Sequence, residues 1–116
     1  MTIFDILYDQ TGDNCLASLH QRSNEILYRS NMIKSFSNLS AIEFYNELVG
    51  ELPKMEEHTK LTVVYNESDN SSENVLMVFR SDAMNNKKLI NTFEGDAADK
   101  IYNMLSTFIP RKRSYD

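Results

Sequence analysis

Few side chains in this sequence have a type and spacing that could carry out a reaction. The one string that suggests catalysis is Asp9-Gln-Thr-Gly12, because a loop of this composition can present a reactive carboxylate. That chemistry needs a second carboxylate loop that shares a proton with the first, and the sequence has no second string of this kind. Asp, Thr and Gly are also common turn formers, so the string predicts a turn.

The imidazoles, the thiol and the glycines do not add a recognisable site. His20 and His58 stand far apart in the sequence, whereas metal ligands usually come in pairs a few residues apart. Cys15 has no basic neighbour in the sequence that would activate its thiol. The three glycines are too dispersed for a phosphate-binding loop. We therefore expect no catalytic residue, no metal, no cofactor and no small-molecule substrate.

The chain that must position these side chains is short. Its 116 residues, 41% hydrophobic and 25% charged, suit one folded domain and leave no room for a two-domain enzyme. We expect a single globular domain over residues 1–110, without an internal repeat, and a basic tail over residues 111–116. The acidic N-terminal segment, the single cysteine and the lack of a long apolar run predict a cytoplasmic protein without a membrane span.

The distribution of charge disfavours nucleic acid as a partner. The formal net charge is −5, and residues 40–74 hold two lysines against eight acidic residues. Proteins that bind nucleic acid usually show a basic stripe, and here the basic cluster is Arg111-Lys112-Arg113 in the tail. Protein is therefore the expected partner.

Hydrophobic spacing and turn residues predict the elements of the first third of the chain. Residues 3–9 favour a short helix, because Thr2 and Asp5 have the spacing of a helix cap, although a strand is also compatible. Residues 15–20 and 25–33 predict a hairpin. The competing interpretation joins both runs into one long helix, which their many Ser and Asn residues disfavour.

The rest of the chain gives clearer signals. Ser40 and Glu43 form a capping box that predicts a helix over residues 41–52, ended by Pro53. Apolar runs predict three strands, and a polar stretch between the first two predicts a dispensable surface loop. The strands are expected at residues 60–66, 75–81 and 88–93, the loop at residues 67–74, and a last helix from Gly95-Asp96 to Pro110.

These elements give an α+β domain of order α-β-β-α-β-β-β-α, with a five-stranded antiparallel sheet flanked by helices. From Gly12 to Ile109 this order resembles the Roadblock/LC7 family and, less closely, longin-type domains. The resemblance implies a central helix on one face of the sheet and the terminal helices on the other. It also implies a homodimer or heterodimer within complexes that serve small GTPases, membrane traffic or motors. It rests on element order, so it assigns no functional residue.

The predicted central helix supplies a candidate partner-binding edge. Its apolar residues span about 160° of the helical wheel, which is wider than the roughly 100° that packing on a sheet requires. The edge left over carries Phe44 and Leu48 inside an acidic border of Glu47 and Glu51. An apolar centre with a polar rim is typical of a protein interface.

We therefore expect a non-enzymatic adaptor or scaffold subunit that acts by protein-protein binding. One alternative is a small phage- or toxin-associated inhibitor, whose acidic residues 43–73 would block a basic nucleic-acid-binding surface of an enzyme. A weaker alternative is an RNA-associated module, because residues 40–113 also resemble the Alu-binding subunits of the signal recognition particle. The acidic middle of the chain disfavours this last alternative.

Overall fold

The chain folds in the order β-β-β-α-β-β-β-α. The computed structural model describes residues 1–22, 30–81, 84 and 86–109. In chain order its elements are β1 (Thr2–Thr11), β2 (Asn14–Arg22), β3 (Ser30–Ser37), α1 (Leu39–Val49), β4 (His58–Asn66), the short 3-10 helix η1 (Ser71–Glu73), β5 (Val75–Ser81), β6 (Lys87–Glu94) and α2 (Asp96–Thr107). None of the helices in the described parts of the chain is long and apolar enough to cross a membrane.

All six strands form one antiparallel sheet in the order β3-β2-β1-β4-β5-β6. The α+β class and the pairing of β4 with β5 are confirmed, while the number of strands is six and not five. β2 pairs with β3 as the predicted hairpin requires, but β3 extends to Ser37, and residues 25–29 of the predicted second strand lie outside the described residues. The additional strand is β1, where the sequence favoured a helix. Phe4, Ile6 and Tyr8 alternate into the core from β1, and this period of two is that of a strand.

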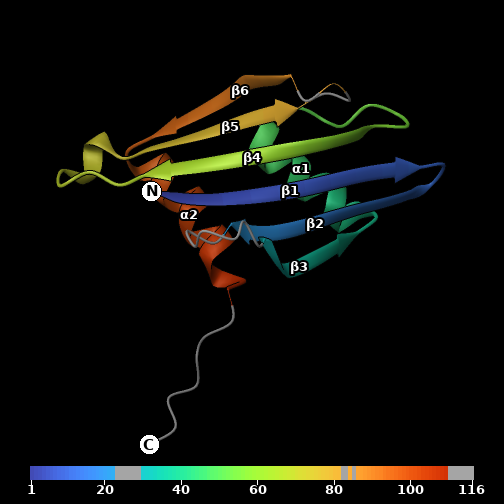
Figure 1. The fold of residues 1–116 in the computed structure, drawn as a ribbon, viewed down its shortest axis with the longest axis horizontal. Helices are drawn as coiled ribbons and strands as arrows, with labels where there is room; N and C mark the ends of the chain where they lie inside the picture. The colour runs from blue at the N-terminus through green and yellow to red at the C-terminus, as the bar shows by residue number, and fades with distance from the viewer. Residues whose placement is uncertain (23–29, 82–83, 85, 110–116) are drawn as a thin grey trace, which may run out of the picture.

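Both helices cover the same face of the sheet, and Figure 1 shows them behind the strands. The ring of Phe4 lies 6.4 Å from that of Tyr102 in α2, and the ring of Tyr8 lies 4.9 Å from that of Tyr45 in α1. Because Phe4 and Tyr8 point to the same side of β1, α1 and α2 share that side. This differs from the two-sided arrangement that the Roadblock-like resemblance implies, because neither described helix lies on the other sheet face.

The fold is built from two similar halves, which corrects the expectation of no internal repeat. Each half is a βββα unit, and β1 and β4, the first strands of the two units, pair at the middle of the sheet. The outer hairpins carry matching register shifts, at Leu19/His20 and at Val78/Phe79. Core positions of the first half return in the second: Tyr8 and Tyr65, Phe36 and Phe93, Ala41 and Ala98, Tyr45 and Tyr102, Leu48 and Leu105.

The two helices also begin alike. Asn38 precedes α1 with φ 52° and ψ −122°, and Gly95 precedes α2 with φ 57° and ψ −126°. Each backbone amide is hydrogen-bonded within its own unit, that of Asn38 to the Cys15 carbonyl and that of Gly95 to the Asn74 carbonyl. The helix therefore starts at Leu39, and the predicted capping box at Ser40 does not form its N-cap. Gly50, at φ 85°, ends α1 ahead of Pro53.

The connection between β4 and β5 is anchored from within. Asn74 is buried, and its side-chain amide donates to the Tyr65 hydroxyl at 3.1 Å and to the Asp99 carboxylate at 2.8 Å. The Tyr65 hydroxyl donates to the same Asp99 oxygen at 2.8 Å. Asn74 therefore links the loop to α2, and residues 67–74 are more than the simple surface loop that their polarity predicted.

Candidate functional site

The predicted partner-binding edge of α1 is mostly inside the molecule. Leu48 is fully buried and Phe44 retains 6% of its surface. The ring of Phe44 stacks on that of Phe36 from β3, with the centroids 4.3 Å apart. The helical-wheel argument assumed a narrower sheet, and the edge strand β3 covers the side of the helix that was expected to stay free. Leu48 therefore offers a partner no surface.

The two predicted acidic residues have different roles. Glu51 is exposed and lies 3.6 Å from the guanidinium of Arg80. Glu47 instead lines a shallow groove of about 270 Å³ between the two helices, together with the remaining surface of Phe44. The full lining is Phe36, Ser40, Glu43, Phe44, Glu47, Met104 and Phe108. The structure thus keeps Phe44 and Glu47 together at a surface depression and separates Leu48 from them.

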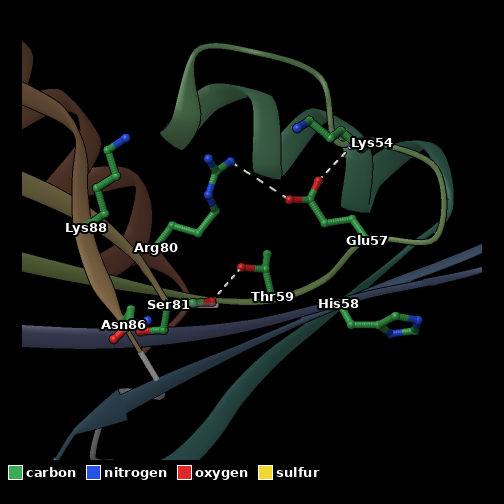
Figure 2. Close-up of a pocket in the computed structure, with 8 residues that line it drawn as sticks. All are labelled: Lys54, Glu57, His58, Thr59, Arg80, Ser81, Asn86 and Lys88. Atoms are coloured by element: carbon green, nitrogen blue, oxygen red, sulfur yellow. Dashed lines mark hydrogen bonds and ion pairs between the residues drawn. The ribbon is translucent and has the colours of Figure 1, made fainter. Parts of the chain in front are cut away.

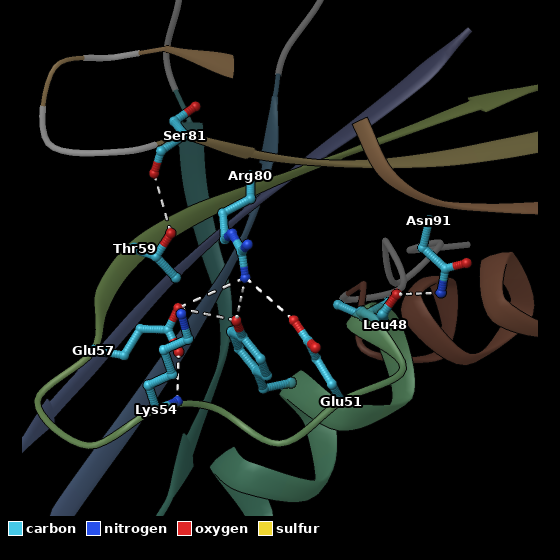
Figure 3. A network of polar contacts seen from close by, with 9 residues as sticks. Leu48, Glu51, Lys54, Glu57, Thr59, Arg80, Ser81 and Asn91 are labelled. Carbon is cyan, nitrogen blue, oxygen red and sulfur yellow. Dashed lines mark hydrogen bonds and ion pairs between the residues drawn. The ribbon is translucent and has the colours of Figure 1, made fainter. Parts of the chain in front are cut away.

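A polar network around Arg80 holds the α1–β4 connection against the sheet (Figure 3). Arg80 donates to the Tyr45 hydroxyl at 3.2 Å, and that hydroxyl donates to Glu57 at 3.1 Å. The other Glu57 oxygen accepts the backbone amide of Lys54 at 2.8 Å. Burial raises the pKa of Tyr45, and the hydrogen bond to Tyr45 raises the pKa of Arg80. These contacts satisfy groups that the fold has partly removed from water, which is a structural role.

Arg80, Glu57 and Lys54 also line a pocket of about 420 Å³, beside the starts of β4 and β6 and the end of β5 (Figure 2). Figure 2 shows Glu57 between Arg80 and Lys54, while the ring of His58 points away from them. Lys88 adds a third cation to the lining. The pocket is weakly cationic, but Glu57 and Glu51 already neutralise most of the charge on Arg80. Nothing in this lining forms a nucleophile, base and oxyanion set.

The residues that first suggested chemistry are dispersed. The Asp9–Gly12 string ends β1 and forms the turn into β2, where Gly12 has φ 59° and its amide donates to Glu56 at 3.1 Å. Asp9 contacts His58 across the β1–β4 pair at 2.6 Å, with both side chains more than half exposed. Cys15 is buried in the core. Asp9, Gln10 and Thr11 are therefore the end of a strand, and the predicted turn is confirmed at Gly12.

The acidic residues of the middle third do not form one face. Glu56 and Glu57 lie before β4, while Glu67, Asp69 and Glu73 follow it. The nine residues of β4 place these groups roughly 30 Å apart. This separation gives no support to the inhibitor alternative, which needs a continuous acidic surface.

The sheet face opposite the described helices is called the open face here. On one side of it, Ile3, Val64 and Met77 stand in register on β1, β4 and β5. Phe79 and Leu89 form the next row on β5 and β6. Leu7, Leu16 and Leu89 are each nearly half exposed. Clustered apolar side chains on an uncovered sheet face are typical of a binding surface.

A charged cluster lies at the centre of the open face. Asp5 accepts two hydrogen bonds from Arg22, at 2.7 and 3.0 Å, and one from Thr62 at 3.2 Å. The ammonium of Lys60 lies 3.8 Å from the same carboxylate. The Asp5 side chain is only 7% exposed, so these neighbours replace nearly all of its water. The cluster carries two cations and one anion and so is mildly positive.

Comparison with protein families, with curated proteins and with solved structures gives no significant match to this chain. The function must therefore be argued from the surfaces described above.

Sequence reasoning missed the open face, although the second side of β1 and of β4 carries apolar residues among its polar ones. Ile3 and Leu7 alternate with the core residues of β1, and Val64 does so in β4. A strand with one wet face usually alternates apolar and polar residues. The additional apolar residues on the second side were the available signal of a surface that binds something.

Proposed function

We propose that this protein is a non-catalytic adaptor subunit that binds protein through the open face of its sheet, with a second copy of the chain as the occupant. The observation that carries the proposal is the group of apolar side chains on the open face of β1, β4, β5 and β6, of which Leu7 and Leu89 are nearly half exposed. Covering these side chains removes apolar surface from water, which stabilises the complex.

The size of the open face fits a stable dimer. Six strands spaced about 4.8 Å apart and about eight residues long give a face of roughly 24 by 27 Å, or about 650 Å². Two such faces would bury roughly 1,300 Å² in total, within the range of about 1,200–2,000 Å² for specific interfaces. Two sheets pack in this way about 10 Å apart, with side chains interdigitating.

The arrangement of residues on the open face allows two copies to match. A two-fold axis across the strands, through the row of Phe79 and Leu89, sets each strand against its own copy. Phe79 and Leu89 then meet their own copies, and Ile3 of one chain meets Leu7 of the other. Lys60 would meet Val64 of the second copy and not another cation, because the two stand two residues on either side of Thr62, which shares the row of Phe79. Such an isologous contact is the common geometry of homodimers.

The two outer edges of the sheet are less suited to association. Lys34 stands on β3, and Lys87 and Lys88 stand on β6. Each edge strand also carries one of the register shifts. Lysines and bulges on edge strands oppose pairing with another chain. Association is therefore expected through the face and not by adding a strand.

Light scattering after size-exclusion chromatography tests the proposal. We expect the chain to have the mass of a dimer at micromolar concentration, and the double variant Leu7→Glu with Leu89→Glu to have the mass of a monomer. The matched control is Leu39→Glu with Leu52→Glu, which changes the charge equally at two leucines that are more exposed but lie off the open face. Circular dichroism should show that both double variants are folded.

Two outcomes would refute the proposal. The first is that the wild-type chain has the mass of a monomer even at high micromolar concentration, because the chain then does not self-associate. Equal loss of the dimer in both double variants would mean that added charge, and not the open face, controls association.

A further inference from the structure

The groove between the helices joins an aromatic floor to an acidic bank. Phe36 stacks on Phe44, and Phe108 meets the ring of Phe36 edge-on at 5.3 Å. These contacts hold the three rings in place without a ligand. Met104, a flexible and polarisable side chain, completes the apolar lining. The floor is therefore preformed and can receive an apolar group without rearrangement.

The acidic bank belongs to α1. Glu43 and Glu47 are four residues apart, so their carboxylates lie next to each other on one side of the helix. Like charges at this spacing oppose each other, and no described residue forms an ion pair or a hydrogen bond with either carboxylate. Lys34 lies on the far side of the groove, where its ammonium is 6.0 Å from the ring centroid of Phe108.

We propose that this groove binds a peptide segment that carries Lys or Arg beside an apolar side chain. The cation would lie between Glu43 and Glu47 and relieve their repulsion, and the apolar side chain would rest on Phe44 and Phe108. The volume of about 270 Å³ is below the 300–1,000 Å³ typical of small-molecule sites, and it suits one or two side chains of a peptide. The groove and the open face lie on opposite sides of the sheet, so an adaptor could use both at once.

An NMR titration tests this site separately from the dimer. The protein used is the Leu7→Glu, Leu89→Glu double variant, which we expect not to dimerise through the open face. The probes are two capped tetrapeptides, Lys-Leu-Phe-Lys and its charge-reversed partner Glu-Leu-Phe-Glu. We expect the basic peptide to shift the amide signals of Phe44, Glu47, Met104 and Phe108, and the acidic peptide to leave them unchanged.

Neutralising the acidic bank supplies the second measurement. Adding Glu43→Gln and Glu47→Gln should weaken binding of the basic peptide roughly fivefold to tenfold, as expected for two exposed ion pairs. The matched control, Glu67→Gln with Asp69→Asn, makes the same change in net charge in the β4–β5 connection and should weaken binding less than about twofold.

Three results would overturn the inference. The first is that the acidic peptide shifts the same signals. The second is that both pairs of substitutions weaken binding equally. The third is that the shifts lie away from the two helices. Each can occur whether or not the chain forms a dimer.

Discussion

Replacing Asp5 by alanine tests whether burial, and not distance, determines the strength of the ion pairs on the open face. Asp5 and Asp9 both lie on β1 and face the same side of the sheet. Asp5 is bound by Arg22 at 2.7 Å, and Asp9 contacts His58 at 2.6 Å. The Asp5 side chain is 7% exposed and that of Asp9 is 62% exposed. The two contacts are thus nearly equal in length and very different in environment.

The structure sets the expected magnitudes. Asp5→Ala leaves Arg22 and Lys60 without their anion and removes three hydrogen bonds. Breaking a fully buried pair costs about 3–5 kcal/mol. Arg22 is 28% exposed and Lys60 is 43% exposed, so both can regain some water. We therefore expect Asp5→Ala to lower the free energy of unfolding by about 2–3 kcal/mol, and Asp9→Ala to lower it by less than about 1 kcal/mol.

Urea unfolding followed by circular dichroism provides the measurement. With a denaturant slope of about 1–3 kcal/mol/M, the Asp5 variant should unfold at a midpoint roughly 1–2 M lower. A double-mutant cycle with Arg22→Ala isolates the pair, and we expect the combined loss to be smaller than the sum of the two single losses. Equal losses for the Asp5 and Asp9 variants, or strict additivity in the cycle, would refute the reasoning.

Three further changes follow from the core, the loop anchor and the helix start. Leu48→Ala should lower the free energy of unfolding in urea by about 2–5 kcal/mol, because Leu48 is fully buried. A loss below about 1 kcal/mol would contradict the burial of this side chain. Burial and the hydrogen bond to Asp99 raise the pKa of Tyr65 from 10.0 to about 12, so the contribution of Tyr65 to stability should be full below pH 10 and be lost as the pH rises to 12. Phenolate absorbance should then appear as the protein unfolds, and normal titration of every tyrosine in the folded state would contradict this. Gly95→Ala should lower the free energy of unfolding by about 1–3 kcal/mol, since φ 57° with ψ −126° strains a residue that has a Cβ. An unchanged free energy would show that alanine is tolerated there, as asparagine is at position 38.

Much of the second half of the fold could be predicted from the sequence because its signals agree. The apolar run that became β5 and the Gly95-Asp96 start of α2 each combine hydrophobic spacing with a clear boundary. The first strand could not be predicted in the same way. Ile3, Ile6 and Leu7 have helical spacing, whereas Phe4, Ile6 and Tyr8 have strand spacing, and pairing with both β2 and β4 decides between them.

The candidate sites depended on contacts between distant parts of the chain. Phe44 looked free because a helical wheel shows how wide an apolar stripe is but not how wide the sheet beneath it is. Phe36 and Phe108, which cover Phe44 and shape the groove, come from β3 and from the end of α2. The buried charge of Asp5 depends on Arg22 and Lys60 arriving from two neighbouring strands. No local pattern contains this information.

The pairing of β1 with β4 has a consequence for how the chain can be assembled. In the described sheet these two strands alone join the βββα halves through backbone hydrogen bonds, and the chain passes from one half to the other through residues 50–57. Continuity of the backbone there is not needed for any strand pairing. Two separately produced fragments, cut within this connection, should therefore recombine into the intact sheet, and so should a permuted chain in which α2 is linked to Thr2 and the new ends lie near Pro53. The same seam could form between two molecules, so a shortened connection is expected to favour exchange of whole halves between chains.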